Sequence, residues 1–270
     1  MRGLLTKFYF ESFGTVFLFG LGLMAIMAVL TVVLPFVLGD IDQFLDSIPF
    51  IRPIIAALLG TDPNAEFTAQ ATQAFLWVHP TVLAMTWAVA VVLCTRIPAG
   101  EIDRGSVDWL LSLPVSRTKI WMSELVGWVV SGAVVILMGF TGHLMASPWM
   151  PEEMRPDRIL AVFVLMNLLA VFVAVGGLSC LISSFCDRRF RAMGIVFLIL
   201  VLSFLLNFLA QFWEPAQKFS FLSVLEYYRP AEVFESHHFP FANVGMLLFL
   251  AAITWGAGLM VFSRRNICTV

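Results

Sequence analysis

Six long stretches with almost no charged residues decide what this chain can fold into. A helix needs about 20 apolar residues to cross a hydrocarbon core of about 30 Å, and each stretch meets that requirement. They cover residues 13–38, 74–93, 121–146, 159–185, 192–213 and 241–262. The chain is 60% hydrophobic and only 13% charged, against roughly 25% charged in soluble domains, so the water-soluble globular class is excluded. We expect an all-α integral membrane protein with a single transmembrane domain over residues 1–270.

The distribution of charge predicts how the spans are oriented. With six crossings, both termini share one side with segments 94–120 and 186–191, and this side carries 11 of the 16 Lys and Arg residues. By the positive-inside rule both termini are therefore cytoplasmic. We expect a multi-pass protein of the plasma membrane, which is the inner membrane in a bacterium. The formal net charge of −2 argues against a nucleic-acid partner.

The segments that flank the first span also have amphipathic patterns. Leu4, Leu5 and Phe8 share one side of a helix, which predicts an N-terminal interfacial helix, and simple membrane anchoring explains it equally well. The first half of the outer loop 39–73 is typical of two short interfacial helices. A plain surface connection and a lid both remain open for this loop, and the role of loop 214–240 is also open.

The cytoplasmic connection between the second and third spans, residues 97–119, has the most informative pattern. Its apolar residues recur at helical spacing and charged residues fill the remaining surface, which predicts an amphipathic helix along the cytoplasmic face. The residues at helical spacing are Ile102, Ser106, Trp109, Leu110 and Leu113. Pro114 should end this helix, and Ser116 can cap the next one. Such a helix either receives a push from a cytoplasmic partner or only covers the ends of neighbouring spans.

The same connection resembles a known family signature. The run is Glu101-x-x-x-Gly105-Ser106-x-x-x-Leu110-Leu111-Ser112-x-Pro114-Val115-x-Arg117. In a six-span chain it is similar to the signature of type-two ABC transporter permeases. The resemblance is closest to the branch that includes the membrane subunit of the nitrous-oxide-reductase maturation transporter. Ser106, where threonine is common, and Val115 are mild departures from the pattern.

The resemblance implies a permease subunit of an ATP-binding-cassette exporter. Residues 97–119, which we call the coupling segment, would dock on a separate ATPase subunit, and a second permease copy would complete a homodimer or heterodimer. The residues expected to take part in ATPase coupling are Glu101, Asp103, Arg104, Gly105, Ser106, Trp109, Leu110, Pro114 and Arg117. The alternative is a non-transporting membrane scaffold or a mechanotransmission subunit of an envelope complex.

The chain lacks the motif of a nucleotide-hydrolysing enzyme. A phosphate-binding loop needs Gly-x-x-x-x-Gly-Lys-Ser/Thr, and none of the three lysines lies in such a run. We therefore expect no catalytic residue and no cofactor here, with ATP and Mg bound by the partner ATPase. An intramembrane hydrolase with Ser179 and His143 is disfavoured, because the predicted topology separates them and a nucleophile must approach its base to about 3 Å.

Few polar groups lie inside the predicted spans. Three uncharged ones either line a pathway or hydrogen-bond between helices: Asn167, Asn207 and Gln211. Glu124 should reach the interface or pair with Arg117 or Lys119. An ion pore is not expected with so few charges. A lipid-like, amphipathic or peptide substrate fits better, as does a device that transmits motion without moving a solute. All four histidines fall on the outer side, where we expect no metal site. The basic segment 186–191 either marks the cytoplasmic side or contacts the ATPase or anionic membrane lipid.

Overall fold

The computed structural model describes residues 2–39, 69–155 and 157–267, and every regular element in this part of the chain is helical. In chain order the elements are α1 (Arg2–Gly39), α4 (Ala69–Val78), α5 (Pro80–Cys94), η1 (Arg96–Gly100), α6 (Glu101–Asp103), α7 (Val107–Ser112), α8 (Arg117–Ala146), η2 (Ser147–Trp149), η3 (Glu152–Met154), α9 (Arg158–Phe185), α10 (Arg189–Ala210), α11 (Glu214–Gln217), η4 (Ser220–Leu222), η5 (Val224–Tyr227), α12 (Pro230–Ser236) and α13 (Phe241–Arg264). Six helical stretches in the described residues are long and apolar enough to cross a membrane. The predicted all-α membrane fold is confirmed.

The observed spans match the predicted ones to within a few residues, except at the start of the first. α1, α8, α9, α10 and α13 each form one span, whereas the second consists of α4 and α5. The break falls at His79, whose ring Nδ1 accepts a hydrogen bond from the Thr81 amide. Pro80 then starts a new helix, where its missing amide hydrogen is not needed. The two interfacial helices predicted in loop 39–73 fall almost entirely on residues 40–68, which lie outside the described residues.

α1 is one unbroken helix of 38 residues. At 1.5 Å per residue it is about 57 Å long, well beyond the hydrocarbon core of about 30 Å. The predicted N-terminal interfacial helix thus forms the first turns of α1 and continues directly into the first span. Phe8 in these turns is fully buried instead of facing lipid. Gly127 on α8 leaves room for the ring, since a Cβ there would lie 2.7 Å from it.

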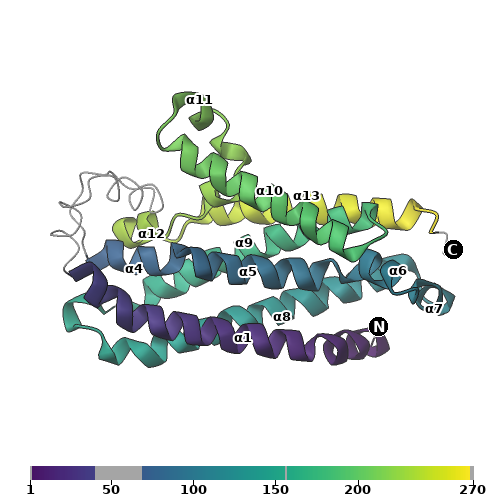
Figure 1. Ribbon diagram of the computed structural model, residues 1–270, viewed down its shortest axis with the longest axis horizontal. Coiled ribbons are helices and arrows are strands. Elements are labelled where there is room, and N and C mark those ends of the chain that lie inside the picture. Colours follow the sequence, from purple (N-terminus) through teal and green to yellow (C-terminus); the bar gives the residue numbers. More distant parts are fainter. Residues whose placement is uncertain (1, 40–68, 156, 268–270) are drawn as a thin grey trace.

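The spans pack in pairs that meet at small residues. α1 runs along α8, α13 runs along α9, and α5 lies against both α1 and α9 (Figure 1). A Cβ on Gly177 of α9 would lie 2.8 Å from the Ala251 carbonyl oxygen of α13, so only glycine permits this separation. Close approach at small residues is the usual basis of helix association in membranes.

The two ends of the bundle differ in what they carry. The start of α1, the end of α13, α6 and α7 all lie at one end, and α11 and α12 lie toward the other (Figure 1). Much of the loop 214–240 is folded, because Val233 and Phe234 are buried and the Tyr228 hydroxyl donates to the Trp77 carbonyl oxygen at 3.2 Å. The coupling segment thus shares one end of the bundle with the start of α1 and the end of α13 (Figure 1).

Candidate functional site: the coupling segment and its ion pairs

The coupling segment forms two short helices, so the prediction of one amphipathic helix is wrong. The chain leaves α5, is extended at Ile97 (φ −124°, ψ 134°) and then enters α6. Gly105 has a φ of +68°, a left-handed conformation that glycine adopts without steric penalty, and α7 follows. Helical spacing of apolar residues does not reveal a residue that leaves the helical conformation, which is why the break was missed.

The second helix, α7, buries one side and exposes another. Val107 and Leu110 are buried, whereas Trp109 is 82% exposed and Leu113 is also exposed. The grouping of Trp109 and Leu113 with Leu110 on one side of a helix is therefore wrong. Trp109 and Leu110 are consecutive residues of α7 and so point about 100° apart, and Leu113 has already left the helix with an extended backbone (φ −65°, ψ 145°).

Glu101 is buried inside the subunit at the base of the coupling segment. Its carboxylate, 1% exposed, accepts hydrogen bonds from Lys7 Nζ at 2.9 Å, Arg104 Nη2 at 3.1 Å and Ser106 Oγ at 2.6 Å. Burial alone would raise the pKa of Glu101, but the hydrogen bonds from Ser106 and Lys7 and the charges of Lys7 and Arg104 hold it below its usual value. Glu101 thus joins α1 to the coupling segment and presents no surface to a partner.

Arg96 is the centre of a second buried ion-pair group. Its guanidinium, nearly inaccessible, pairs with Glu124 on α8 and with Glu11 on α1, and lies 4.7 Å from the centre of the Phe8 ring. The prediction that Glu124 pairs with Arg117 or Lys119 is wrong, because Arg96 at the end of α5 occupies that role. The sequence contained one indication of this pair. A single arginine directly follows the second span, and a single glutamate lies inside the third.

The start of α8 is fixed by two contacts. The Ser116 hydroxyl accepts a hydrogen bond from the Lys119 amide at 3.3 Å, which confirms the predicted cap. Arg117 donates from Nη1 to the carbonyl oxygens of Phe262 and Arg265 at 2.9 and 2.6 Å. These carbonyls lie at the end of α13, where helical partners are lacking. Arg117 therefore links α8 to α13.

The other predicted coupling residues divide between the interior and the exterior. Leu110 is buried and Ser106 is half-buried, while Gly105 is exposed. We define the outer surface of the coupling segment by five of its exposed residues, all close to α6 and α7: Asp103, Arg104, Trp109, Leu113 and Pro114. Pro114 follows the end of α7 as predicted. A large aromatic ring beside charged groups at one end of the bundle is suited to contact with another protein.

The three predicted intramembrane polar residues lie in different surroundings. Asn167 on α9 is fully buried, and neither of its side-chain polar atoms has a partner among the described residues. Asn207 on α10 donates to Glu226 Oε2 at 3.4 Å, and Gln211 is exposed just after α10. No contact in the described part of the chain joins these three side chains.

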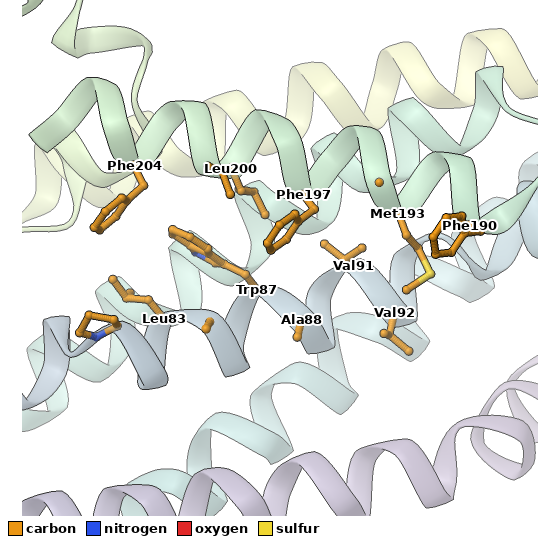
Figure 2. Close-up of a pocket in the computed structure, with 14 residues that line it drawn as sticks. Leu83, Trp87, Ala88, Val91, Val92, Phe190, Met193, Phe197, Leu200 and Phe204 are labelled. Carbon is orange, nitrogen blue, oxygen red and sulfur yellow. The ribbon is translucent and has the colours of Figure 1, made fainter. Parts of the chain in front are cut away.

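A groove of about 550 Å³ runs between α5 and α10. Figure 2 shows Leu83 and Trp87 of α5 on one side and Phe197 and Phe204 of α10 on the other. Its walls are almost wholly apolar, in contrast with the charged base of the coupling segment.

Comparison with known families adds to this geometry. The sequence profile of the family described as ABC-2 family transporter protein matches residues 41–267, which include the coupling segment and five of the six spans. The chain belongs to this ABC-2 family. Its membership supports a multi-pass permease subunit of an ABC transporter and implies an ABC ATPase subunit as partner. A search of the curated proteins found no match for the chain.

Proposed function

We propose that this ABC-2 protein is the permease subunit of an exporter that contains two permease copies and two copies of a separate ATPase. In this proposal the ATPase binds ATP and Mg, and the permease has no catalytic residue. The excess of Lys and Arg on the side of both termini supports a cytoplasmic location for them in a plasma or bacterial inner membrane. ATP binding in the partner would shift the spans as rigid bodies and alternate the exposure of the substrate.

One observation carries the proposal. The base of the coupling segment is held in place by ion pairs, whereas its outer surface is exposed. Glu101 and Arg96, both buried, tie the base to α1, α5 and α8 through ion pairs with the partly exposed Lys7 and Glu11 and with the largely buried Glu124. Charged contacts in surroundings with little water are stronger than the same contacts in solution. A push on Trp109 from the ATPase would therefore reach three spans without being absorbed in a mobile loop.

A non-transporting scaffold or mechanotransmission subunit of an envelope complex is the second candidate, whereas the proposed kinship with the nitrous-oxide-reductase maturation branch belongs with the permease. The nearly complete lack of polar lining in the groove between α5 and α10 leaves a polar solute without a hydrogen-bond partner there, which fits both this second candidate and the transport of a lipid-like substrate. The coupling segment would still receive motion from an ATPase, and the spans would pass it to an envelope partner.

Affinity purification of the tagged protein in mild detergent, with assay of ATP hydrolysis, tests the shared core of both candidates. We expect a stoichiometric P-loop ATPase to co-purify with the wild type and to be lost from the Asp103→Lys/Trp109→Ala variant. Trp149→Ala is the matched control, since Trp149 is also an exposed tryptophan but lies at the other end of α8. Equal ATPase recovery in both variants would contradict docking at this surface, and recovery of non-ATPase partners alone would favour a scaffold.

A further inference from the structure

Three arginines each bind the C-terminal end of a helix, at the end of the bundle that carries the coupling segment. The last carbonyl oxygens of a helix have no partner inside it, and the helix dipole favours a positive charge beside them. Arg117, the first residue of α8, donates to two such carbonyl oxygens at the end of α13. The other two arginines do the same for α9 and α5.

Arg265 binds the end of α9. It directly follows α13, and its Nη1 donates to the carbonyl oxygens of Ser184 and Cys186 at 2.8 and 3.2 Å. Its guanidinium is also paired with Asp187. The backbone carbonyl oxygen of the same residue accepts the hydrogen bond from Arg117 at 2.6 Å. Arg265 therefore contacts α8 through its backbone and α9 through its side chain.

Arg189 binds the end of α5. It is the first residue of α10, and its Nη2 donates to the Val92 carbonyl oxygen in the last turn of α5 at 2.7 Å. The side chain also passes close to the coupling segment, because a Cβ on Gly100 would lie 3.2 Å from Arg189 Cδ. The start of α10 is thus held against the end of α5 and the beginning of the coupling segment.

These three contacts and two chain connections close a ring of five spans. The coupling segment joins α5 to α8, and residues 186–188 join α9 to α10. Arg117 joins α8 to α13, Arg265 joins α13 to α9, and Arg189 joins α10 back to α5. Every contact in the ring lies within one chain, so the ring is independent of whatever covers the outside of the subunit.

We propose that Arg117, Arg189 and Arg265 are positioning residues that close this ring and pass a displacement of the coupling segment to α10 and α13. The ion pairs of Glu101 and Arg96 reach only α1, α5 and α8. A guanidinium donates several hydrogen bonds in a fixed planar geometry, so each junction transmits both position and orientation. The role in movement rests on the proposed function, whereas the ring itself does not.

Amide hydrogen exchange of the purified full-length permease tests the ring without the ATPase. The readout is the protection factor of the amides in the last turn of α5, residues 91–94. Arg189→Gln should lower it about tenfold, because a hydrogen bond from a charged group is lost. Arg117→Gln, at the opposite side of the ring, should lower it about threefold. In the Arg189→Gln background, where the ring is already open, Arg117→Gln should have almost no further effect.

The comparison of these backgrounds decides the matter, because Arg117 and Arg189 share no partner and separate sites normally have additive effects. An Arg117→Gln effect of the same size in both backgrounds, or none in either, would overturn the ring. Arg264→Gln is the matched control, since Arg264 is the exposed neighbour of Arg265, and it should leave the protection factor unchanged. If the double variant does not fold, Arg117→Lys/Arg189→Lys keeps both charges, removes the planar contacts and allows the same comparison.

A second measurement tests the role in movement in the complex with the co-purified ATPase. A non-hydrolysable ATP analogue with Mg should change the protection factors of residues 186–191 about threefold in the wild type, and Arg265→Gln should abolish this response. A response that persists in Arg265→Gln would overturn the role in movement. Failure to recover an ATPase would contradict the proposed function and, with it, the role in movement, but it would leave the result of the first measurement standing.

Discussion

α9 and α10 are consecutive spans of similar apolar character, yet they occupy opposite kinds of environment. In an apolar window of 18 residues taken from each helix, 67% of the residues are buried inside the subunit in α9 but only 17% in α10. α9 meets its neighbours at small residues such as Gly177 and Ser183, whereas α10 presents Phe190 and Phe197 outward. Apolar side chains gain little by leaving lipid, so close packing depends on small residues. Hydropathy thus identifies a span, and the position of small residues decides whether it belongs to the core.

The largest difference in stability is expected between two substitutions of glycine by leucine, one on α9 and one on α10. Gly177→Leu forces α13 away from α9, because its Cβ lies 2.8 Å from the Ala251 carbonyl oxygen, and should lower the free energy of unfolding by about 3 kcal/mol. Gly194→Leu on α10 enters open space and should change it by less than about 0.5 kcal/mol. Thermal unfolding in one detergent measures both. Equal losses would break the contrast between α9 and α10.

A second test asks whether α9 also holds the coupling segment. The Ser183 hydroxyl accepts a hydrogen bond from the buried Ala99 amide at 3.2 Å. Ser183→Ala leaves that amide without a partner and should lower the free energy of unfolding by about 2 kcal/mol, with faster amide hydrogen exchange near residue 99. Ser184→Ala is the control, because Ser184 donates only to Leu181 in its own helix. Unchanged exchange in Ser183→Ala would show that α9 does not position the segment.

Replacing an asparagine on each helix should give a smaller effect of opposite sign. Asn167→Leu on α9 removes two buried polar atoms that have no partner among the described residues and should raise the free energy of unfolding by about 1 kcal/mol. Asn207→Leu on α10 loses only a long, half-buried contact with Glu226 and should have almost no effect. Chemical unfolding of the two variants measures the difference. A destabilised Asn167→Leu would refute the interpretation that its polar groups are unsatisfied.

The smallest effect should come from lowering the pH, which should destabilise the coupling segment without affecting α10. The pKa of Glu101 is held below its usual value, so its ionised form stabilises the folded state above the ordinary glutamate pKa, and that stability is lost as the pH falls further. The protection factors of the amides in residues 99–112, which correct for the intrinsic pH dependence of exchange, should therefore be smaller below about pH 4 than at pH 7, while those along the groove, which has no titratable lining, are unaffected. Glu101→Gln should remove this pH dependence, and its persistence in that variant would assign it to another group.

The sequence was sufficient to predict the structural features that depend on short, continuous runs of residues. The length of each apolar stretch located the spans, Pro114 marked the end of α7, and Ser116 was correctly identified as the cap of α8. Each of these depends on local chemistry. The pattern of residues 101–117 also led to the family that the profile match supports.

Contacts between residues that lie far apart in the sequence could not be predicted from local patterns. Arg96 pairs with Glu11 and Glu124, which lie 85 and 28 positions away, and no local spacing indicates that choice. The burial of Glu101 depends on Lys7, which only the packing of α1 brings near. The exposure of Trp109 follows from its place beside the buried Leu110 on α7, because consecutive helical residues point about 100° apart. Spacing rules also assume an unbroken helix and fail where Gly105 leaves the helical conformation.

The ion pairs at the base of the coupling segment also set an order for biosynthesis. Lys7 and Glu11 leave the ribosome long before Arg96, Glu101 and Glu124. At ordinary rates of translation the interval is on the order of ten seconds. During that time the first span has to enter the membrane with both charges still in water. Only the arrival of the third span completes the ion pairs of Arg96 with Glu11 and Glu124, so the bundle closes at this end after its first half has been made.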